Sequence, residues 1–501
     1  MVRLPKRLLI ANRGEIAVRV ARTSREMGIE PVGVFAASEA DAFHVRHMAR
    51  CADLGSGGAA ETYLSIPRLI EAAKALKAEA VHPGYGFLSE NAGFARAVSE
   101  AGLLWIGASP ESIERMGDKL EARRRVREAG VPVVPGSDSS LPDSGSGEAD
   151  LLRRGSEIGF PLLVKAARGG GGKGMVRVDR AEDLPAALEE TRRVAQAAFA
   201  DGSVYLEKLL DAPRHVEFQV FGDRHGSVVH LFERECSVQR RHQKVLEETP
   251  SAALDPRLRQ AMGRAATEAA RAVAYVGAGT VEFLLDERRD FYFLEMNTRL
   301  QVEHAITEET LGLDLVRAQI EIAAGAALPA PWRGGKLVPQ GHAIELRLYA
   351  EDPVEFLPRS GRILLWEEPA GPGIRVDAGA GAGTVVGLDY DPLLAKLVVS
   401  APDRVSAIER SKRALAEWVI LGVETNAPFL DAVLSSPEFR SGRYSTDLAS
   451  RILRSEEGAS VPDAAWIAAA LSAVPAREAA PAAGGADRDP WDEQVGWRIG
   501  A

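Results

Sequence analysis

The stretch Leu162-Leu-Val-Lys165-Ala-Ala-Arg-Gly-Gly-Gly-Gly-Lys173-Gly-Met-Val-Arg-Val178 decides which fold we expect. Two short apolar runs flank glycines that are bracketed by Lys165 and Lys173. Glycine lets backbone N–H groups wrap phosphate oxygens, and lysines add positive charge where phosphate is held. A flexible linker is the competing interpretation of the glycines alone. The apolar runs favour a strand–loop–strand flap over phosphates, and the loop lacks the ending of a Walker A loop.

A second pair of strand-like runs carries acidic residues. The runs Thr280–Asp286 and Phe291–Asn297 are separated by four residues. If the last residue of the first run faces the first residue of the second, Glu282 lies opposite Glu295, with Asn297 on the same face. Two carboxylates about 5 Å apart repel by roughly 3 kcal/mol at an effective dielectric of about 20, and Mg²⁺ would remove that repulsion. Glutamates that face solvent are the alternative, and the pattern leaves both open.

Polar residues continue beyond this predicted hairpin. In Thr298–His304, Arg299 is a candidate for anion stabilisation and Glu303 for a general base, because they follow the proposed metal site. An ordinary surface loop is the alternative. The run Gln239–Lys244 holds four potentially cationic side chains. In a chain with a net charge of −10, an anionic ligand explains such a run better than a solvated basic loop does.

The chain as a whole predicts an α/β fold with α+β parts. Alternating strand and helix patterns near the N-terminus, beginning with Leu8–Ile10, indicate a parallel sheet flanked by helices. Ser65 is expected to cap a helix that has Pro67 in its first turn. Another helix is expected over Arg257–Val276, with Gly277 as its stop. We divide the chain into an N-terminal domain (1–117), a second domain (118–330, with a lid at about 135–208), a C-terminal domain (335–453) and a flexible tail (454–501).

Composition restricts the class of protein. The 501 residues are 46% hydrophobic and 26% charged, as in a soluble globular protein with two or three domains. The acidic net charge argues against nucleic acid or a membrane surface as a partner. Cys51 and Cys236 are too few for a disulfide framework and are expected to be reduced thiols. No apolar run is long enough for a signal peptide or a membrane span, so we expect a cytoplasmic protein.

Taken together, these stretches resemble the biotin carboxylase family of the ATP-grasp superfamily. The likeness is collinear from about Arg7 to Leu453. Besides the glycine loop, it is carried by Ala11–Ala17, His82–Asn91, Met116–Lys119, Arg214–Glu217, Gln239–Glu248, Glu295–His304 and Gly341–Arg347. The resemblance implies an ATP-grasp fold with a Rossmann-like N-terminal domain, a mobile glycine-flap lid and a C-terminal mixed-sheet domain.

The resemblance also implies roles for individual residues. The catalytic group comprises Lys244, Arg299, Glu303 and Arg347. The ATP-binding group comprises Lys119, Lys165, Gly169, Gly170, Gly171, Gly172, Lys173, Gly174, Met175, Glu207, Lys208, Leu210, His215, Gln239, His242 and Leu284. Bicarbonate and biotin would contact Lys244, Arg299, Gln301, Val302, Arg347 and Tyr85. The metal ligands, for Mg²⁺ or Mn²⁺, would be Glu282, Glu295 and Asn297.

The family's reaction uses ATP and bicarbonate to carboxylate biotin through carboxyphosphate, as the first half-reaction of an acetyl-CoA or other acyl-CoA carboxylase. The sequence contains no Ala-Met-Lys-Met attachment site. We therefore expect a separate biotin carboxyl carrier protein or domain and a carboxyltransferase as partners, and a homodimer. Arg168 and Ala305 stand where family members commonly have Gly and Pro. The alternatives are another ATP-grasp ligase, joining a carboxylate to an amine, and a nucleotide-binding subunit without catalysis. The predicted biotin and bicarbonate residues argue against the first, and Glu303 against the second.

Overall fold

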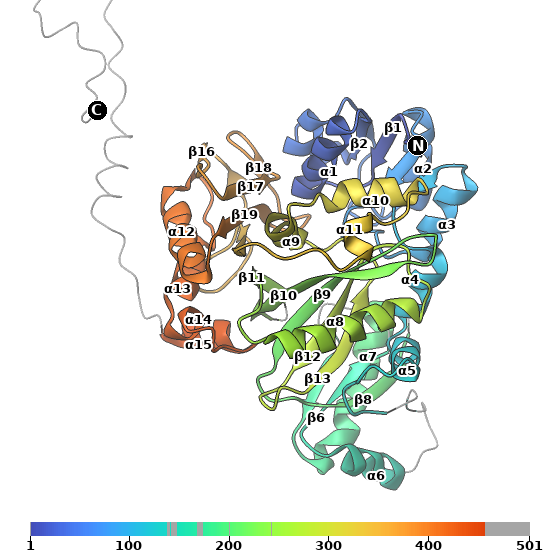
Figure 1. Cartoon of the computed structure of the whole chain (residues 1–501), viewed down its shortest axis with the longest axis vertical. Coiled ribbons are helices and arrows are strands. Elements are labelled where there is room, and N and C mark those ends of the chain that lie inside the picture. Colours follow the sequence, from blue (N-terminus) through green and yellow to red (C-terminus); the bar gives the residue numbers. More distant parts are fainter. Residues whose placement is uncertain are drawn as a thin grey trace, which may run out of the picture. The chain divides into compact units, whose positions relative to one another are not determined.

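The computed structural model describes residues 2–137, 141, 148–167, 174–199, 201–241 and 243–455. Met1–Leu453 form one compact unit, shown in Figure 1. Arg454–Ala501 form a second unit, so the predicted tail lies, beyond Ser455, outside the described residues. Among the described helices, none is long and apolar enough to cross a membrane.

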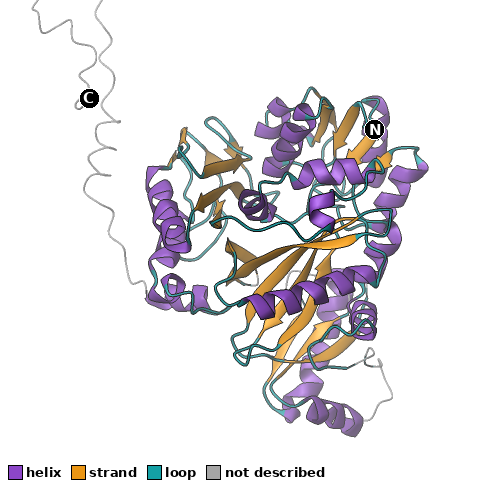
Figure 2. Ribbon diagram, viewed as in Figure 1, coloured by secondary structure: helices purple, strands orange, loops and turns teal. Residues whose placement is uncertain are grey.

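The N-terminal part is the predicted parallel sheet with helices beside it (Figure 2). Its strand order is β3-β2-β1-β4-β5, and every neighbouring pair is parallel. The strands are β1 (Arg7–Ile10), β2 (Glu30–Phe35), β3 (Arg50–Asp53), β4 (Ala80–His82) and β5 (Leu104–Trp105). The helices are α1 (Gly14–Glu26), α2 (Ile66–Ala75), α3 (Ala92–Glu100) and α4 (Pro110–Gly117), with short 3-10 turns at Ala37–Glu39 and Phe43–His47. The central strand β1 is mostly apolar because both faces of the sheet are covered there, and the side chains of Leu8, Leu9 and Ile10 are fully buried.

The lid is a small antiparallel sheet with strand order β7-β6-β8. Its elements are α6 (Glu148–Ile158), β6 (Leu162–Ala166), β7 (Met175–Val178), the 3-10 turn Ala181–Asp183, α7 (Leu184–Phe199) and β8 (Val204–Lys208), and α5 (Lys119–Glu128) precedes it. Lys165 pairs with Met175 across β6 and β7, which confirms that the two apolar runs flanking the glycines are paired strands. The intervening residues 168–173 lie outside the described residues.

An eight-stranded sheet forms the centre of the molecule, in the order β13-β12-β9-β10-β11-β14-β19-β17. Its strands are β9 (Arg214–Gly222), β10 (Val228–Arg240), β11 (Gln243–Thr249), β12 (Gly277–Leu285), β13 (Phe291–Asn297), β14 (His342–Tyr349), β17 (Ile374–Ala378) and β19 (Leu393–Ala401). The described pairs are all antiparallel, including those of the C-terminal part, where we expected a mixed sheet. The pairing of β11 with β14 makes this sheet continuous across the boundary we predicted near residue 335.

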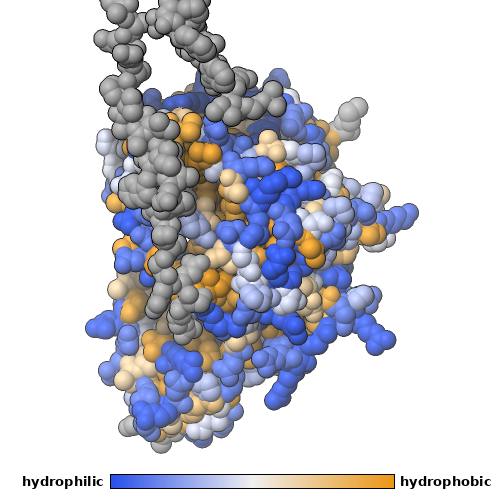
Figure 3. All heavy atoms as spheres, turned by 90° about the vertical axis from the view of Figure 1, so that its left-hand side faces the viewer, coloured by the Kyte–Doolittle hydropathy of each residue, from blue (hydrophilic) through white to orange (hydrophobic). Residues whose placement is uncertain are grey.

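The remaining elements pack against this sheet or belong to the C-terminal part of the chain (Figure 1). Helix α8 packs against β9 and β10, and α12 packs against β14 and β19. The helices are α8 (Pro256–Arg271), α9 (His304–Leu311), α10 (Leu315–Ala323), α11 (Ala330–Arg333), α12 (Arg404–Glu417), α13 (Ala427–Ser435), α14 (Pro437–Arg440) and α15 (Leu448–Ser455). Two small sheets pair β15 (Gly361–Arg362) with β18 (Val385–Val386) and β16 (Leu365–Glu367) with β20 (Val419–Leu421). Figure 3 shows hydrophilic residues over much of one face, with smaller apolar patches between them.

The hairpin register differs from the predicted one at its turn but agrees at the acidic pair. Leu285, rather than Asp286, pairs with Phe291, because Asp286 belongs to the turn, where its amide donates to the Asp290 carbonyl oxygen at 2.9 Å. A register shift follows, and Glu282 then pairs with Glu295 as expected. The shift is a β-bulge, in which one strand carries an extra residue.

Two helix predictions need correction at their ends. Helix α8 ends at Arg271 rather than near Val276, because Ala274 adopts a φ of +50°, which an α-helix excludes. Gly277 therefore begins β12 and is not the stop of the helix. In α2 the side chain of Ser65 makes no capping hydrogen bond, although Pro67 lies in the first turn as expected.

Candidate active site

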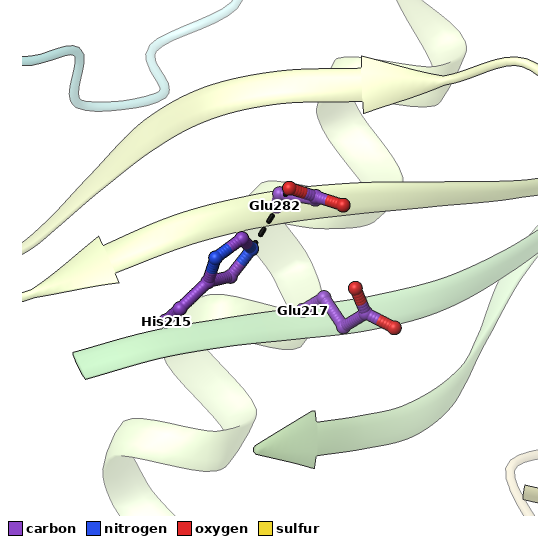
Figure 4. Close-up of side chains that lie close together, drawn as sticks. All are labelled: His215, Glu217 and Glu282. Atoms are coloured by element: carbon purple, nitrogen blue, oxygen red, sulfur yellow. Dashed lines mark ion pairs between the residues drawn. The ribbon is translucent and has the colours of Figure 1, made fainter. Parts of the chain in front are cut away.

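The site begins as a row of acidic residues across three neighbouring strands. Glu217 on β9 pairs with Glu282 on β12, which pairs with Glu295 on β13. Because residues directly opposite in a sheet share a face, the three side chains lie on one side of it. His215, two residues from Glu217, lies on the same face, and its Nε2 is 2.8 Å from Glu282 Oε2 (Figure 4).

Lys244 lies at the centre of this acidic face. Its Nζ is 2.5 Å from Glu217 and 2.8 Å from both Glu282 and Glu303. Burial lowers the pKa of Lys244, but the three carboxylates outweigh it and raise that pKa well above its usual value. Lys244 is therefore a protonated donor that holds carboxylates from two strands and one loop together.

Glu303 is the best-placed candidate for a base. It is fully buried and immediately precedes α9. One carboxylate oxygen accepts from Lys244 Nζ at 2.8 Å and the other from Arg347 Nη2 at 2.9 Å. Burial raises the pKa of Glu303, but Lys244 and Arg347 outweigh it and lower that pKa well below its usual range. Glu303 is therefore ionised and can accept a proton.

Arg299 is held by hydrogen bonds on three sides. Its Nε donates to Glu90 Oε2 at 2.9 Å, Nη1 to Gln301 Oε1 at 2.7 Å, and Nη2 to Asn297 Oδ1 at 3.1 Å. Gln301 in turn donates to Glu282 Oε1 at 3.0 Å. Sequence reasoning missed Glu90, although the residue lies within the His82–Asn91 motif. The available signal was a carboxylate inside a motif that the chain shares with the family it resembles.

The predicted metal ligands fit a hard cation in their chemistry. Two carboxylates and an amide oxygen are the donor types that Mg²⁺ or Mn²⁺ takes. Desolvation and the neighbouring Glu282 raise the pKa of Glu295, against an opposing effect of Lys119. The positive charge near Glu295 is therefore too small to balance the two carboxylates. A divalent cation would relieve this. Among the described His, Cys, Asp and Glu residues, the compact ligand groups are His215–Glu217–Glu282 and Glu217–Cys236–Glu303, which include Glu282 but not Glu295.

Several of the predicted nucleotide residues lie in the lid, on β6 and β8. Lys165 donates to Glu207, which also accepts from Arg123 Nη1 at 2.7 Å. The Nζ of Lys208 donates to the carbonyl oxygens of Gly159 and Phe160, at 2.9 and 3.0 Å.

The other residues of the predicted ATP-binding group lie in several parts of the fold. Gln239 Nε2 lies 2.7 Å from His215 Nδ1, which brings these two predicted residues together. The side chains of Lys119, Met175, Leu210 and Leu284 are half-buried. Gly174 has a φ of +71°, a conformation that favours glycine. Gly169, Gly170, Gly171, Gly172, Lys173 and His242 lie outside the described residues, as does Arg168.

The basic run Gln239–Lys244 does not form one cationic surface. It spans the end of β10 and the start of β11, so neighbouring side chains alternate in direction. Arg240 pairs with Glu351 at 2.5 Å, whereas Arg241 is exposed and has a φ of +49°. Of the described cations in this run, only Lys244 reaches the acidic face, because strand pairing separates the others from it.

A cavity of about 410 Å³ opens beside Arg347 and the 299–303 loop. Tyr85, Arg299, Val302 and Arg347, all predicted to face bicarbonate or biotin, line it. Glu15 of α1 and Tyr390 also line it, and neither was predicted from the sequence. The volume is in the range of pockets that enclose a small organic ligand.

Three family models match the chain. They are the biotin carboxylase N-terminal domain over residues 4–113, the carbamoyl-phosphate synthase L chain ATP-binding domain over residues 118–331, and the biotin carboxylase C-terminal domain over residues 345–451. The biotin carboxylase of Halalkalibacterium halodurans is 47% identical over 453 residues, covering 90% of this chain and 99% of that protein.

Two solved structures have similar folds. A biotin carboxylase–β-γ-ATP complex from Campylobacter jejuni has a TM-score of 0.86 at 42% identity and covers 89% of this chain and 99% of that one. The biotin carboxylase domain dimer of the Hydrogenobacter thermophilus 2-oxoglutarate carboxylase, in complex with MgADP, ADP and bicarbonate, also has a TM-score of 0.86, at 41% identity. It covers 91% of this chain and all of that one.

Proposed function

Because the chain belongs to the biotin carboxylase family and is an ATP-dependent ligase that carboxylates biotin, we propose that Glu303 is the base that activates bicarbonate. The observation that carries this assignment is the placement of the buried Glu303 carboxylate between Lys244 and Arg347, at 2.8 and 2.9 Å. These cations stabilise Glu303 as a carboxylate in the absence of substrate. When Lys244 and Arg347 turn hydrogen bonds toward anionic bicarbonate, Glu303 loses part of its counter-charge, and its pKa and basicity rise.

In the first step, which uses ATP and Mg²⁺, bicarbonate attacks the γ-phosphorus and displaces ADP, giving carboxyphosphate. We propose that Lys119 and Lys165 bind the phosphates, and that the flap around residues 168–174 excludes water from the labile product. Glu282, Glu295 and Asn297 would hold the metal, which when bound offsets charge on the phosphoryl oxygens. Lys244 lies between Glu217 and Glu282, so it fixes the spacing of the acidic face beside that position.

In the second step we propose that biotin enters the cavity lined by Tyr85, Arg299 and Arg347. Carboxyphosphate breaks down to CO₂ and phosphate, and phosphate takes the N1′ proton of biotin. The guanidinium groups of Arg299 and Arg347 then stabilise the enolate-like anion that attacks CO₂. Gln301 and Val302 would help to hold bicarbonate in the first step, because they lie on the same loop as Glu303.

The test is phosphate release from ATP by the full chain, with and without bicarbonate and free biotin. We expect slow bicarbonate-dependent release that biotin accelerates. Glu303→Gln should bind ATP normally but lose at least ~100-fold in turnover, a typical contribution of a positioned base. The exposed Glu268→Gln should behave as wild type. Release that ignores biotin and is stimulated by an amine would favour a carboxylate–amine ligase, and ATP binding without any release would favour a regulatory subunit.

Biotin carboxylases act with a biotin carrier and a carboxyltransferase in carboxylase complexes, and one similar structure is a dimer. We propose that a biotin carboxyl carrier protein or domain presents biotin to this chain, and that the chain forms a homodimer. The cytoplasmic location and the domain boundaries stay predictions from the sequence. The acyl-CoA carboxylated downstream is a property of the carboxyltransferase.

A further inference from the structure

A lysine outside the predicted site is buried directly behind it. Lys396 on β19 is 0% exposed, and its Nζ donates to the carbonyl oxygen of Val302 at 2.7 Å. Val302 immediately precedes Glu303 and lines the cavity. Lys396 therefore holds the backbone of the loop that carries the proposed base.

The same ammonium also contacts a carboxylate of the cavity wall. Lys396 Nζ lies 3.4 Å from Glu15 Oε1 and 4.0 Å from Asp377. Burial lowers the pKa of Lys396, but Glu15, Glu345 and Asp377 outweigh it and raise the pKa above its usual value. The side chain is a cation with one backbone acceptor and acidic neighbours. A buried ammonium is costly, and an apolar side chain would fill the core without that cost.

Glu15 connects this cation to the cavity. The residue lies in the first turn of α1, and its carboxylate accepts a hydrogen bond from the Tyr85 hydroxyl. Glu15 and Tyr85 both line the cavity. Gly379 packs closely against this turn, since a Cβ there would lie 2.5 Å from the Glu15 backbone nitrogen. The backbone of Glu15 is therefore fixed by packing, whereas its side chain makes the contacts with Tyr85 and Lys396.

We propose that Tyr85, Glu15 and Lys396 form a polar relay through which biotin in the cavity positions the Val302–Glu303 backbone. The relay rests on the proposed function, in which Tyr85 faces biotin and Glu303 is the base. Biotin packed against Tyr85 shifts the Tyr85–Glu15 hydrogen bond, and Glu15 transmits the shift to the ammonium that holds Val302. Lys396 and Glu15 are positioning residues, and they make bicarbonate-dependent ATP cleavage respond to the biotin acceptor.

The relay is tested in the full chain with Lys396→Met and Glu15→Gln. Phosphate release with bicarbonate is measured with and without free biotin, and the ratio of the two rates is compared with wild type. We expect each variant to lower this ratio at least ~10-fold, the loss of one charge-assisted hydrogen bond, with the KM for ATP within about twofold of wild type. The double variant should lower it no further than the worse single variant, because both cut one chain of contacts. Lys412→Met, on α12 and paired at 3.3 Å with Asp431, is the control and should leave the ratio unchanged.

The outcomes separate the relay from the proposed function. A ratio within about twofold of wild type in both single variants, or losses that add in the double variant, would overturn the relay. If Lys396→Met melts early and loses ATP binding, the nearly isosteric Glu15→Gln decides by the same ratio. If wild type itself shows no bicarbonate-dependent release, the proposed function fails and the relay fails with it. If wild type responds to biotin and the variants respond equally, the relay alone fails.

Discussion

Replacing Lys244 with methionine removes the only cation that contacts Glu217, Glu282 and Glu303 together in the described site. Their side chains are at most 5% exposed, and the Lys244 side chain is 12% exposed. Methionine keeps an unbranched side chain of similar length, so the substitution mainly deletes charge and hydrogen bonds. Removing one partner of a buried ion pair costs ~3–5 kcal/mol of unfolding free energy. The three contacts share one ammonium, so their energies do not add and we expect a loss in this range at pH 7.

The pH dependence of this loss has a definite sign. In wild type, burial raises the pKa values of Glu282 and Glu303, but Lys244 contributes to lowering both below their usual range. A carboxyl whose pKa is lowered on folding stabilises the protein above its unfolded pKa, near 4.3, and that stability is lost as pH falls through the folded pKa. In Lys244→Met the same carboxyls are raised by burial with less compensation, and protonation relieves them. The difference between wild type and variant should therefore be largest near pH 7 and shrink toward pH 4.

Urea unfolding followed by tryptophan fluorescence at pH 7 and pH 5 measures both quantities. The control is Lys412→Met, whose partly exposed pair with Asp431 should contribute no more than about 1 kcal/mol at either pH. A loss below about 1 kcal/mol for Lys244→Met at pH 7, or a difference that widens on acidification, would refute the reasoning. Phosphate release by the folded fraction should fall at least ~100-fold, because the proposed contact with bicarbonate is lost.

Three further results are expected. Burial raises the pKa of Glu248, but His342 and Arg404 outweigh it and lower that pKa to about 2. Below pH 4.5 the unfolding free energy of wild type should therefore fall by ~1.4 kcal/mol per pH unit relative to Glu248→Gln. Unfolding free energies that change in parallel from pH 5 to pH 3 would contradict this. Ser109→Ala should cost ~1 kcal/mol of unfolding free energy, because the Ser109 hydroxyl accepts a capping hydrogen bond from Ser112 N at 3.2 Å. Ser65→Ala removes no capping hydrogen bond and should cost much less. Equal losses of the two variants in urea unfolding would be the contrary result. Glu282→Gln should raise the Mg²⁺ concentration for half-maximal phosphate release at least ~10-fold, while the exposed Glu268→Gln leaves it unchanged; an unaltered Mg²⁺ titration would exclude Glu282 as a ligand.

The β12–β13 hairpin was predicted correctly at its acidic pair and wrongly at its turn. Alternation along two runs and the short connection between them led to the correct pairing of Glu282 with Glu295. The first strand was predicted one residue too long and the turn one residue too short, and a bulge in the strand pair compensates for this difference. A bulge depends on packing against the rest of the sheet, and the residues of the hairpin alone do not reveal it. The end of α8 was misplaced for a similar reason, since no residue type in Ala272–Tyr275 demands a left-handed turn.

The sequence by itself determined the parallel N-terminal sheet, the paired strands of the lid and the types of residue at the site, because strand periodicity and acidic pairs are local features. Only the tertiary structure decided that Lys244 joins Glu217, Glu282 and Glu303, and that Lys396 holds Val302 from 94 residues away. These contacts depend on which strands become neighbours and in which register. A one-residue change of register would turn the side chains on the strands, Lys244 among them, to the opposite face of the sheet and away from Glu303, so their chemistry exists only in the folded chain.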